Sequence, residues 1–214
     1  MKKFVFLLGI LFAMQMVVRA QVTEQTVTFN AHLISTFNLN MLDGGTQDIT
    51  FNTALDYNTG VTGPLGLNPG ITTGTTHITV EATEDWHLTI TAQDNFVGYA
   101  GPNGAGTGTI PVDNVGVWCE ATGLYTFGDQ LTCTFLDPLS IRGLEVLVDI
   151  TLIGIGGSGN AGDISDNAFT LNWEMGTMQN ASMHTTSMFD QMANGDFSTG
   201  DFTADAILTL VPGP

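Results

Sequence analysis

The chain has 214 residues, of which 43% are hydrophobic, and its four Lys and Arg residues stand against 21 Asp and Glu residues, which gives a formal net charge of −17. This length and composition suffice for one domain with a full hydrophobic core. So few basic residues exclude the Lys- and Arg-rich surfaces that bind nucleic acid or anionic membranes. We therefore expect an acidic domain with no nucleic-acid partner.

The first 20 residues are typical of a secretory signal peptide. Lys2 and Lys3 precede an apolar run over residues 4–14, and residues 18–20 (Val-Arg-Ala) place small side chains at the spacing of a cleavage site. The run is shorter than the roughly 20 residues that a membrane-spanning helix needs. We predict cleavage after residue 20, a mature domain over residues 21–214 with no membrane span, and a secreted, extracellular or cell-surface location.

Export changes both the charge and the expected redox state of the chain. Loss of the leader leaves Arg142 as the one basic residue against all 21 acidic residues, a formal charge of −20 (1 − 21). Cys119 and Cys133 then lie in an oxidising space, where thiols usually pair. They enclose a loop of about 15 residues, for which a disulfide contributes roughly 3 kcal/mol in the chain-entropy model. We predict a Cys119–Cys133 disulfide in a hairpin-like segment, with free buried thiols as the alternative.

The exported part alternates apolar and polar residues with a period of two, and it has almost no helical periodicity. Clusters of Gly, Asn, Asp and Pro separate the alternating runs. One run is apolar on both phases, as in a central strand covered on both faces; it spans residues 144–155. In chain order, the expected strands contain residues 27–33 with 37–41, 49–51, 78–82, 86–92, 110–112, 115–117, 131–135, 144–155, 169–173 and 202–210.

Eight or more short strands joined by such turns predict an all-β protein. We expect a single antiparallel β-sandwich, Greek-key or jelly-roll-like, over residues 21–214. A parallel α/β fold would need crossover helices between its strands, and the pattern contains none. No linker or block of charge divides the mature chain.

Motifs for catalysis are weak. Residues 154–159 (GIGGSG) match the dinucleotide fingerprint, but turn and strand residues follow them in place of the helix that would hold a pyrophosphate. Ser158 lacks the G-x-S-x-G frame of a nucleophile elbow. The histidines are scattered, with no metal-ligand spacing; they are His32, His77, His87 and His184. We therefore predict that the protein is not an enzyme.

Two acidic loops are candidate calcium sites. Asp163 and Asp166 lie in the loop GDISDN, and Asp196 and Asp201 lie in the loop NGDFSTGD. Calcium binds carboxylate and carbonyl oxygens of such turns. Neither loop is an EF-hand, and solvated turns are the alternative. We expect no other cofactor. The Met-rich segment 175–192 is interpreted as packing, because Met fills irregular gaps, with copper(I) binding or a contact surface as alternatives.

Residues 78–96, ITVEATEDWHLTITAQDNF, resemble the first signature of the WxL domain, a bacterial surface module. Trp86 and Leu88 match its W-x-L motif. The C-terminal stretch GDFTADAILTLVP is similar in place and phase to the second signature, with Leu208 where the family has Trp and Leu210 two residues later. The resemblance implies a β-rich module that associates non-covalently with the Gram-positive cell wall. Trp86 has a second interpretation as a core residue, since it shares one strand phase with Leu88 and Ile90.

Taken together, the sequence predicts a secreted, non-catalytic, cell-surface or envelope-associated protein that is structural or binds the wall. Its expected partners are cell-envelope polysaccharide or peptidoglycan, or further copies of itself. One alternative is a self-assembling filament or adhesin subunit that adds an exposed strand, residues 22–34, to a neighbour. Another is a carbohydrate-binding module with an aromatic platform drawn from Tyr57, Tyr99, Trp118 and Tyr125.

Overall fold

The computed structural model describes residues 34–61, 74–137 and 139–213. It divides the chain into one unit that ends at Ile34 and a second that runs from Ser35 to Pro214. The second unit holds all the strands and helices given below, and its antiparallel sheets form a sandwich, which confirms the predicted all-β fold class. The predicted signal peptide and the predicted strand at 27–33 lie outside the described residues.

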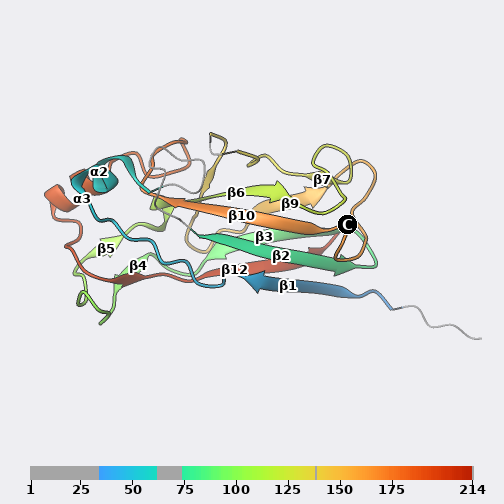
Figure 1. The fold of residues 1–214 in the computed structure, drawn as a ribbon, viewed down its shortest axis with the longest axis horizontal. Coiled ribbons are helices and arrows are strands. Elements are labelled where there is room, and N and C mark those ends of the chain that lie inside the picture. Colours follow the sequence, from blue (N-terminus) through green and yellow to red (C-terminus); the bar gives the residue numbers. More distant parts are fainter. Residues whose placement is uncertain (1–33, 62–73, 138, 214) are drawn as a thin grey trace, which may run out of the picture. The chain divides into compact units, whose positions relative to one another are not determined.

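The first sheet has five strands in the order β1-β2-β10-β6-β8, each antiparallel to its neighbours (Figure 1). β10 is its central strand and is buried on both faces: Phe169, Leu171 and Trp173 point into the sandwich, and the alternate residues are buried as well. The bounds are β1 Phe37–Asp43, β2 Thr75–Ala82, β10 Ala168–Met175, β6 Val115–Ala121 and β8 Arg142–Gly143.

The second sheet has four strands in the order β12-β3-β9-β7, and a third, smaller sheet has the order β11-β4-β5. The two are continuous, because β4 follows β3 in the chain and β11 precedes β12. Ala206 of β12 pairs with Ala92, and Thr203 of β11 pairs with Val97. The bounds are β12 Ala206–Pro212, β3 Trp86–Ala92, β9 Ile150–Ile155, β7 Leu131–Thr132, β11 Phe202–Thr203, β4 Phe96–Gly98 and β5 Thr109–Ile110.

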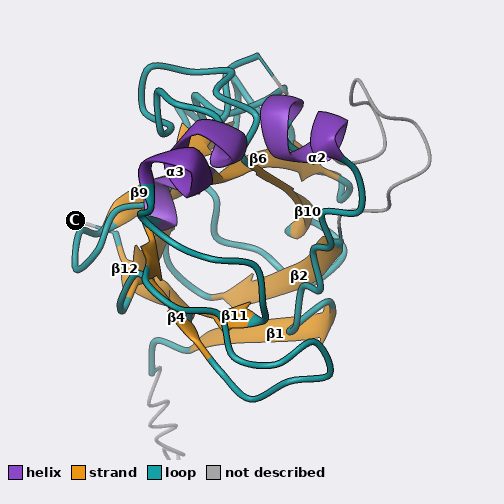
Figure 2. Cartoon of the chain, turned by 90° about the vertical axis from the view of Figure 1, so that its left-hand side faces the viewer, coloured by secondary structure: helices purple, strands orange, loops and turns teal. Residues whose placement is uncertain are grey.

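Two short α-helices, α2 (Ala54–Thr59) and α3 (Met188–Asn194), contact each other at one end of the sheets, and the 3-10 turn η1 spans Val112–Asn114 (Figure 2). The Thr53 side chain accepts a hydrogen bond from the Asp56 amide, and the Asp56 carboxylate accepts one from the Thr53 amide, so α2 begins with a capping box. α3 begins at a Ser187 cap and ends at Gly195, a left-handed residue.

The core lies between the sheets and is built from the inward phase of each strand. Trp86 is 0% exposed, and its ring meets Phe169 edge-on with centroids 5.9 Å apart. Asn160 holds it in place: its side-chain oxygen accepts from the Trp86 amide at 2.9 Å, and its carbonyl accepts from the indole N–H at 3.0 Å. Trp86 is therefore the core residue that its strand phase indicated.

Two predicted strands differ from the structure. Residues 46–52 alternate as expected, with Ile49 and Phe51 facing inward, but they pair with no described strand. The run 144–155 forms a strand from Ile150 onward, while its first half is a turn in which Leu147 has a φ of 56° and is exposed. The run is apolar on both phases for two reasons. Leu144 packs in the core before the turn, and residues of β9 pack in the core after it.

A second, small core covers the outer face of the first sheet. A carboxyl group lies buried in this region: Glu174 of β10 is 1% exposed, and it accepts a hydrogen bond from the Thr177 hydroxyl. Burial raises the pKa of Glu174 to about 7, because the charged form is disfavoured away from water. The small outer core consists of Trp118, Ile141 and Met183, and Phe135 packs against it. Met183 belongs to the Met-rich segment, which therefore contributes packing, as interpreted.

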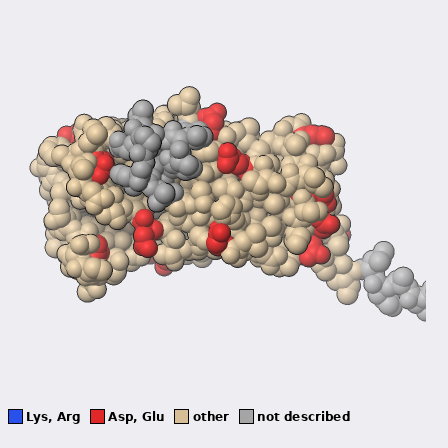
Figure 3. All heavy atoms as spheres, viewed as in Figure 1, with Lys and Arg blue, Asp and Glu red and all other residues tan. Residues whose placement is uncertain are grey.

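The surface of the second unit carries its acidic groups in a dispersed arrangement. Figure 3 shows Asp and Glu side chains scattered over one face, with no Lys or Arg in view. Arg142, the basic residue of the described ranges, is half-buried and donates to the Glu145 carboxylate. Such a surface repels anionic partners.

Candidate functional site

One side of the sandwich is bordered by two long edge strands. β1 is the edge of the first sheet and β12 is the edge of the second, and the two strands contact each other (Figure 1). Among the described residues, β1 pairs with β2 alone and β12 with β3 alone. The outer N–H and C=O groups of both strands therefore offer hydrogen bonds to a further strand.

The inward side chains of these two edges are incompletely covered. Phe37 and Leu39 of β1 and Leu208 and Leu210 of β12 pack against the core yet stay partly exposed. The inward residues of β3, by contrast, are at most 1% exposed. Each edge strand also has an apolar side chain that is largely exposed: the exposed fraction is 50% for Met41 of β1 and 49% for Ile207 of β12. This side of the core is thus open along two strands.

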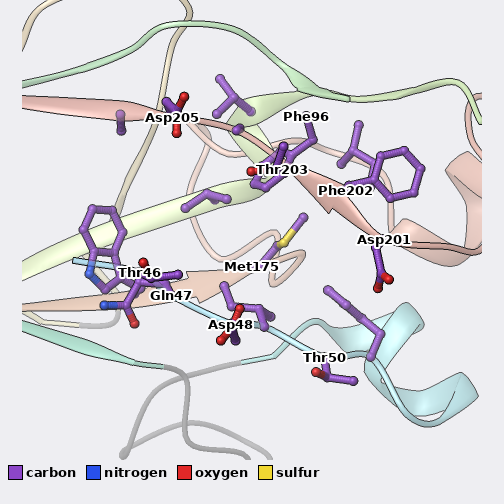
Figure 4. Close-up of a pocket in the computed structure, with 18 of the residues that line it drawn as sticks. Thr46, Gln47, Asp48, Thr50, Phe96, Met175, Asp201, Phe202, Thr203 and Asp205 are labelled. Atoms are coloured by element: carbon purple, nitrogen blue, oxygen red, sulfur yellow. The ribbon is translucent and has the colours of Figure 1, made fainter. Parts of the chain in front are cut away.

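A groove of about 860 Å³ continues this opening toward α2 and α3. We call it the open groove; Met41 and residues 44–52 line one wall, and residues 197–206 with Leu208 line the other. Figure 4 shows Thr46, Gln47 and Asp48 on the first wall facing Asp201 to Asp205 on the second.

The floor of the open groove is the main core itself. Ile90 of β3 and Trp173 and Met175 of β10 line it. The Trp173 indole N–H donates to the Thr76 hydroxyl at 2.9 Å, so the ring is fixed and its polar atom is already paired. An apolar floor of this kind binds apolar side chains through the hydrophobic effect.

The rim of the open groove is polar and acidic. The Gln47 side-chain amide donates to the Gly44 carbonyl at 2.6 Å and to the Thr76 hydroxyl at 3.0 Å. Asp201 accepts from the Asn103 amide and side chain, at 2.7 and 2.8 Å. Asp48 and Asp205 are exposed beside them. No Lys or Arg is among the described lining residues, so the rim disfavours a strongly acidic ligand.

The first wall contains the unpaired alternating segment 46–52. Gln47, Ile49 and Phe51 are half-buried, while the residues between them are exposed. The groove was not predicted from the sequence, because alternation shows that a strand exists but not whether it has a neighbour. An alternating run with no partner is the feature that could have indicated it.

The WxL-like residues are brought together on two adjacent strands, and those of the first signature lie away from solvent. Leu208 pairs with Ile90 and Leu210 with Leu88, so the two stretches that carry the resemblance are adjacent strands. Trp86 and Leu88 are buried, and Leu208 lines the open groove.

The predicted calcium ligands cap their own turns. The Asp163 carboxylate accepts from the Ser165 amide and hydroxyl, at 2.7 and 2.6 Å, which lowers its pKa, and Asp166 accepts from the Asp163 amide. Asp201 is held by Asn103, and Asp196 is exposed. In the described ranges, no three His, Cys, Asp or Glu side chains gather as a metal site would require.

The predicted disulfide is not present in the structure. Cys119 and Cys133 are free and lie 4.2 Å apart. The hairpin that suggested their pairing was wrong, because Cys119 is in β6 of the first sheet whereas Cys133 follows β7 of the second. A hydrogen bond from Cys119 to Cys133, together with burial, raises the pKa of Cys119, and the same bond lowers the pKa of Cys133.

The four residues of the proposed aromatic platform do not assemble. Tyr57 and Tyr99 line the open groove, but Trp118 is buried in the small outer core. Tyr125 donates its hydroxyl to the Ala161 carbonyl at 2.8 Å. Only two of the four predicted platform residues, Tyr57 and Tyr99, thus lie at the groove.

Comparisons with known proteins add no family. Neither a scan against protein-family models nor a search of curated proteins gave a match. Within the part of the chain that the structure describes, none of the helices has the length and apolar character needed to cross a membrane.

Proposed function

We propose that the protein is a secreted, non-catalytic structural protein of the cell surface, anchored by an extended polypeptide segment that binds in the open groove. The observation that carries the proposal is an apolar floor bordered by the ends of two edge strands, Met41 of β1 and Ala206 and Leu208 of β12. Strand addition uses both features, since main-chain hydrogen bonds supply affinity and alternate side chains fill apolar space.

Envelope polysaccharide, the partner that the WxL-like resemblance implies, is the second candidate. Tyr57 and Tyr99 favour it, because rings with a polar tip suit partly wet sites. The deeper ring favours polypeptide: Trp173 is only 9% exposed and its N–H is already bonded. Competition between soluble wall polysaccharide and extended peptides for the purified protein separates the two ligands.

Surface retention in the native cells tests the proposal. Ala206→Glu places a carboxylate in the groove wall, whereas Thr209→Glu adds the same charge on the opposite phase of β12, outside the groove. Both positions are exposed, so we expect both variants to melt near the wild-type temperature. Ala206→Glu should move most of the protein from the surface fraction to the medium, and Thr209→Glu should not. Equal retention of the two variants would refute the proposal.

A further inference from the structure

We propose that the partner bound in the open groove is a segment of a different protein that alternates apolar residues with Lys or Arg. The inference rests on the proposed function, since it names the chemistry of the polypeptide that occupies the same groove. Two features of the groove carry it: an apolar floor, and a rim of carboxylates that have no cationic partner among the described residues.

Three carboxyl groups lie along the rim of the open groove. Asp48 is on the first wall, and Asp201 and Asp205 are on the second (Figure 4). The ion pairs within the described ranges involve other acidic residues, so nothing there neutralises these three groups. Their charge is therefore available to a ligand.

A ligand that covers the apolar floor also removes water from these carboxylates. The floor includes Ile90, Trp173 and Met175. A carboxylate that loses water without gaining a polar or charged partner costs free energy. A neutral apolar segment would leave that cost uncompensated, and an acidic segment would add repulsion. A segment with Lys or Arg beside its apolar residues supplies the missing partners, so the groove favours this combination.

An aromatic ring beside one of the carboxylates is a second indication of a cationic ligand. The position that a Cβ atom of Gly101 would take lies 2.3 Å from Oδ2 of Asp201 and 2.9 Å from Cε2 of Tyr99. The two side chains are thus immediate neighbours, and Tyr99 is 44% exposed. Cations are attracted to aromatic faces as well as to anions. One guanidinium or ammonium group can therefore contact both side chains.

The second wall also indicates how the basic residues are spaced. Asp201 and Asp205 are four residues apart, which is up to about 13 Å of extended chain at roughly 3.3 Å per residue. A segment that lies along this wall meets both groups with basic residues about four positions apart. Successive side chains of an extended segment point to opposite faces. We therefore expect basic residues on one phase, toward the rim, and apolar residues on the other, toward the floor.

A second copy of this chain does not offer such a segment. Three of its four basic residues, Lys2, Lys3 and Arg19, lie in the predicted signal peptide. The fourth, Arg142, is half-buried and donates to the Glu145 carboxylate. The rest of the chain is strongly acidic, so two copies repel each other. The partner is therefore a different protein.

A random peptide library tests which chemistry the groove selects. A phage-displayed library of nonapeptides is selected on the immobilised mature protein with excess soluble Ala206→Glu protein as competitor. The competitor has the same acidic surface, so it removes peptides that bind outside the groove or are attracted by overall charge alone. We expect the remaining peptides to alternate apolar and basic residues, with Lys and Arg enriched about threefold or more over the library. A remaining set without this enrichment, or no remaining peptide, would overturn the inference.

Variants that neutralise charge then locate the effect at the rim. Asp48→Asn with Asp205→Asn removes two rim charges, whereas Glu81→Gln with Glu120→Gln removes two charges from exposed strand positions outside the groove. The rim variant should bind a selected peptide about three- to tenfold more weakly than wild type, and the control variant should bind it within about twofold. Equal affinities of the two variants would assign the attraction to the whole acidic surface and refute the role of the rim.

The inference and the proposed function fail on different results. Groove-dependent peptides without Lys or Arg would leave an extended polypeptide as the ligand and exclude a basic one. Full surface retention of Ala206→Glu in the native cells would refute the anchoring function, while the peptide selection would still decide the chemistry of the groove.

Discussion

The two sides of the sandwich are closed in different ways. On one side, the segment 130–135 crosses between the sheets: the Gly156 amide donates to the Gln130 carbonyl at 2.8 Å, and the Cys119 amide donates to the Phe135 carbonyl at 2.7 Å. The edge strands there, β7 and β8, have two residues each. On the other side, β1 and β12 have seven residues each and no described segment bridges them.

Burial follows this difference. On the closed side Leu131 and Ile141 are at most 1% exposed, whereas on the open side the inward residues Leu39 and Leu208 are half-buried. Proteins commonly protect sheet edges by shortening or covering them, and the closed side shows both devices. The open side shows neither, which is why we place the proposed binding groove there. Four measurements would break or sharpen this contrast.

Trp86→Ala gives the largest expected effect, and it sets the reference value for truncating a fully buried side chain. The ring is fully buried and bonded to Asn160, so its removal should lower the free energy of unfolding by about 3–5 kcal/mol. His87, on the opposite phase of β3, is the control, and His87→Ala should stay within about 0.5 kcal/mol of wild type. Chemical denaturation measures both. A stable Trp86→Ala protein would mean that the core around β3 is not closed.

Leu131→Ala and Leu208→Ala compare the two sides directly. Leu131 is fully buried on the closed side, so its truncation should cost about 2–5 kcal/mol. Leu208 already contacts solvent, so its truncation should cost less, about 1 kcal/mol by lost area. Urea denaturation of the two variants and the wild type makes the comparison. Equal losses would show that the open side is as well packed as the closed one.

Glu174→Gln tests the buried carboxyl on the outer face of β10. Since folding raises the pKa of Glu174 from 4.5 to about 7, the folded state binds the extra proton between these values. Its contribution to stability is present below about pH 4.5 and is lost as pH rises to 7.

The resulting loss in the free energy of unfolding between low and neutral pH is about 3 kcal/mol at most. Glu174→Gln should therefore stabilise the protein at pH 8 but hardly at pH 4, as measured by denaturation at both values. Glu81→Gln, at an exposed position of β2, controls for the general repulsion of the acidic surface. The same pH dependence in both variants would contradict a special role of the buried group.

The cysteine pair gives the smallest expected effect. Cys133 is more exposed than Cys119, and the hydrogen bond between them lowers the pKa of Cys133 while it raises that of Cys119. Because the thiolate is the reactive form, Cys133 should be alkylated first in the native, unreduced protein. Mass spectrometry of the labelled peptides checks the order. Protein that takes up no label until reductant is added would instead contain the disulfide that the sequence predicted.

The sequence predicted the strands with strong alternation and could not predict their neighbours. Residues 86–92 and 169–173 were identified as strands because each has one fully apolar phase. The partner of each strand depends on contacts between distant residues, which alternation does not encode. For the same reason the spacing of Cys119 and Cys133 suggested a hairpin, although Cys119 lies in β6 of the first sheet and Cys133 follows β7 of the second. The open groove, which exists because 46–52 has no described partner, was equally invisible.

Arg142 determines where proteases of the trypsin class can cut the domain. It is the one basic residue of the described ranges, and proteases of the trypsin class cut only after Lys or Arg. The bond between Arg142 and Gly143 lies within β8, where both residues pair with β6, and the side chain is engaged by Glu145. Cleavage requires a segment that can leave its sheet and extend into a protease. For this class of enzyme, the domain therefore presents a single cutting site, and that site is held in the folded sheet.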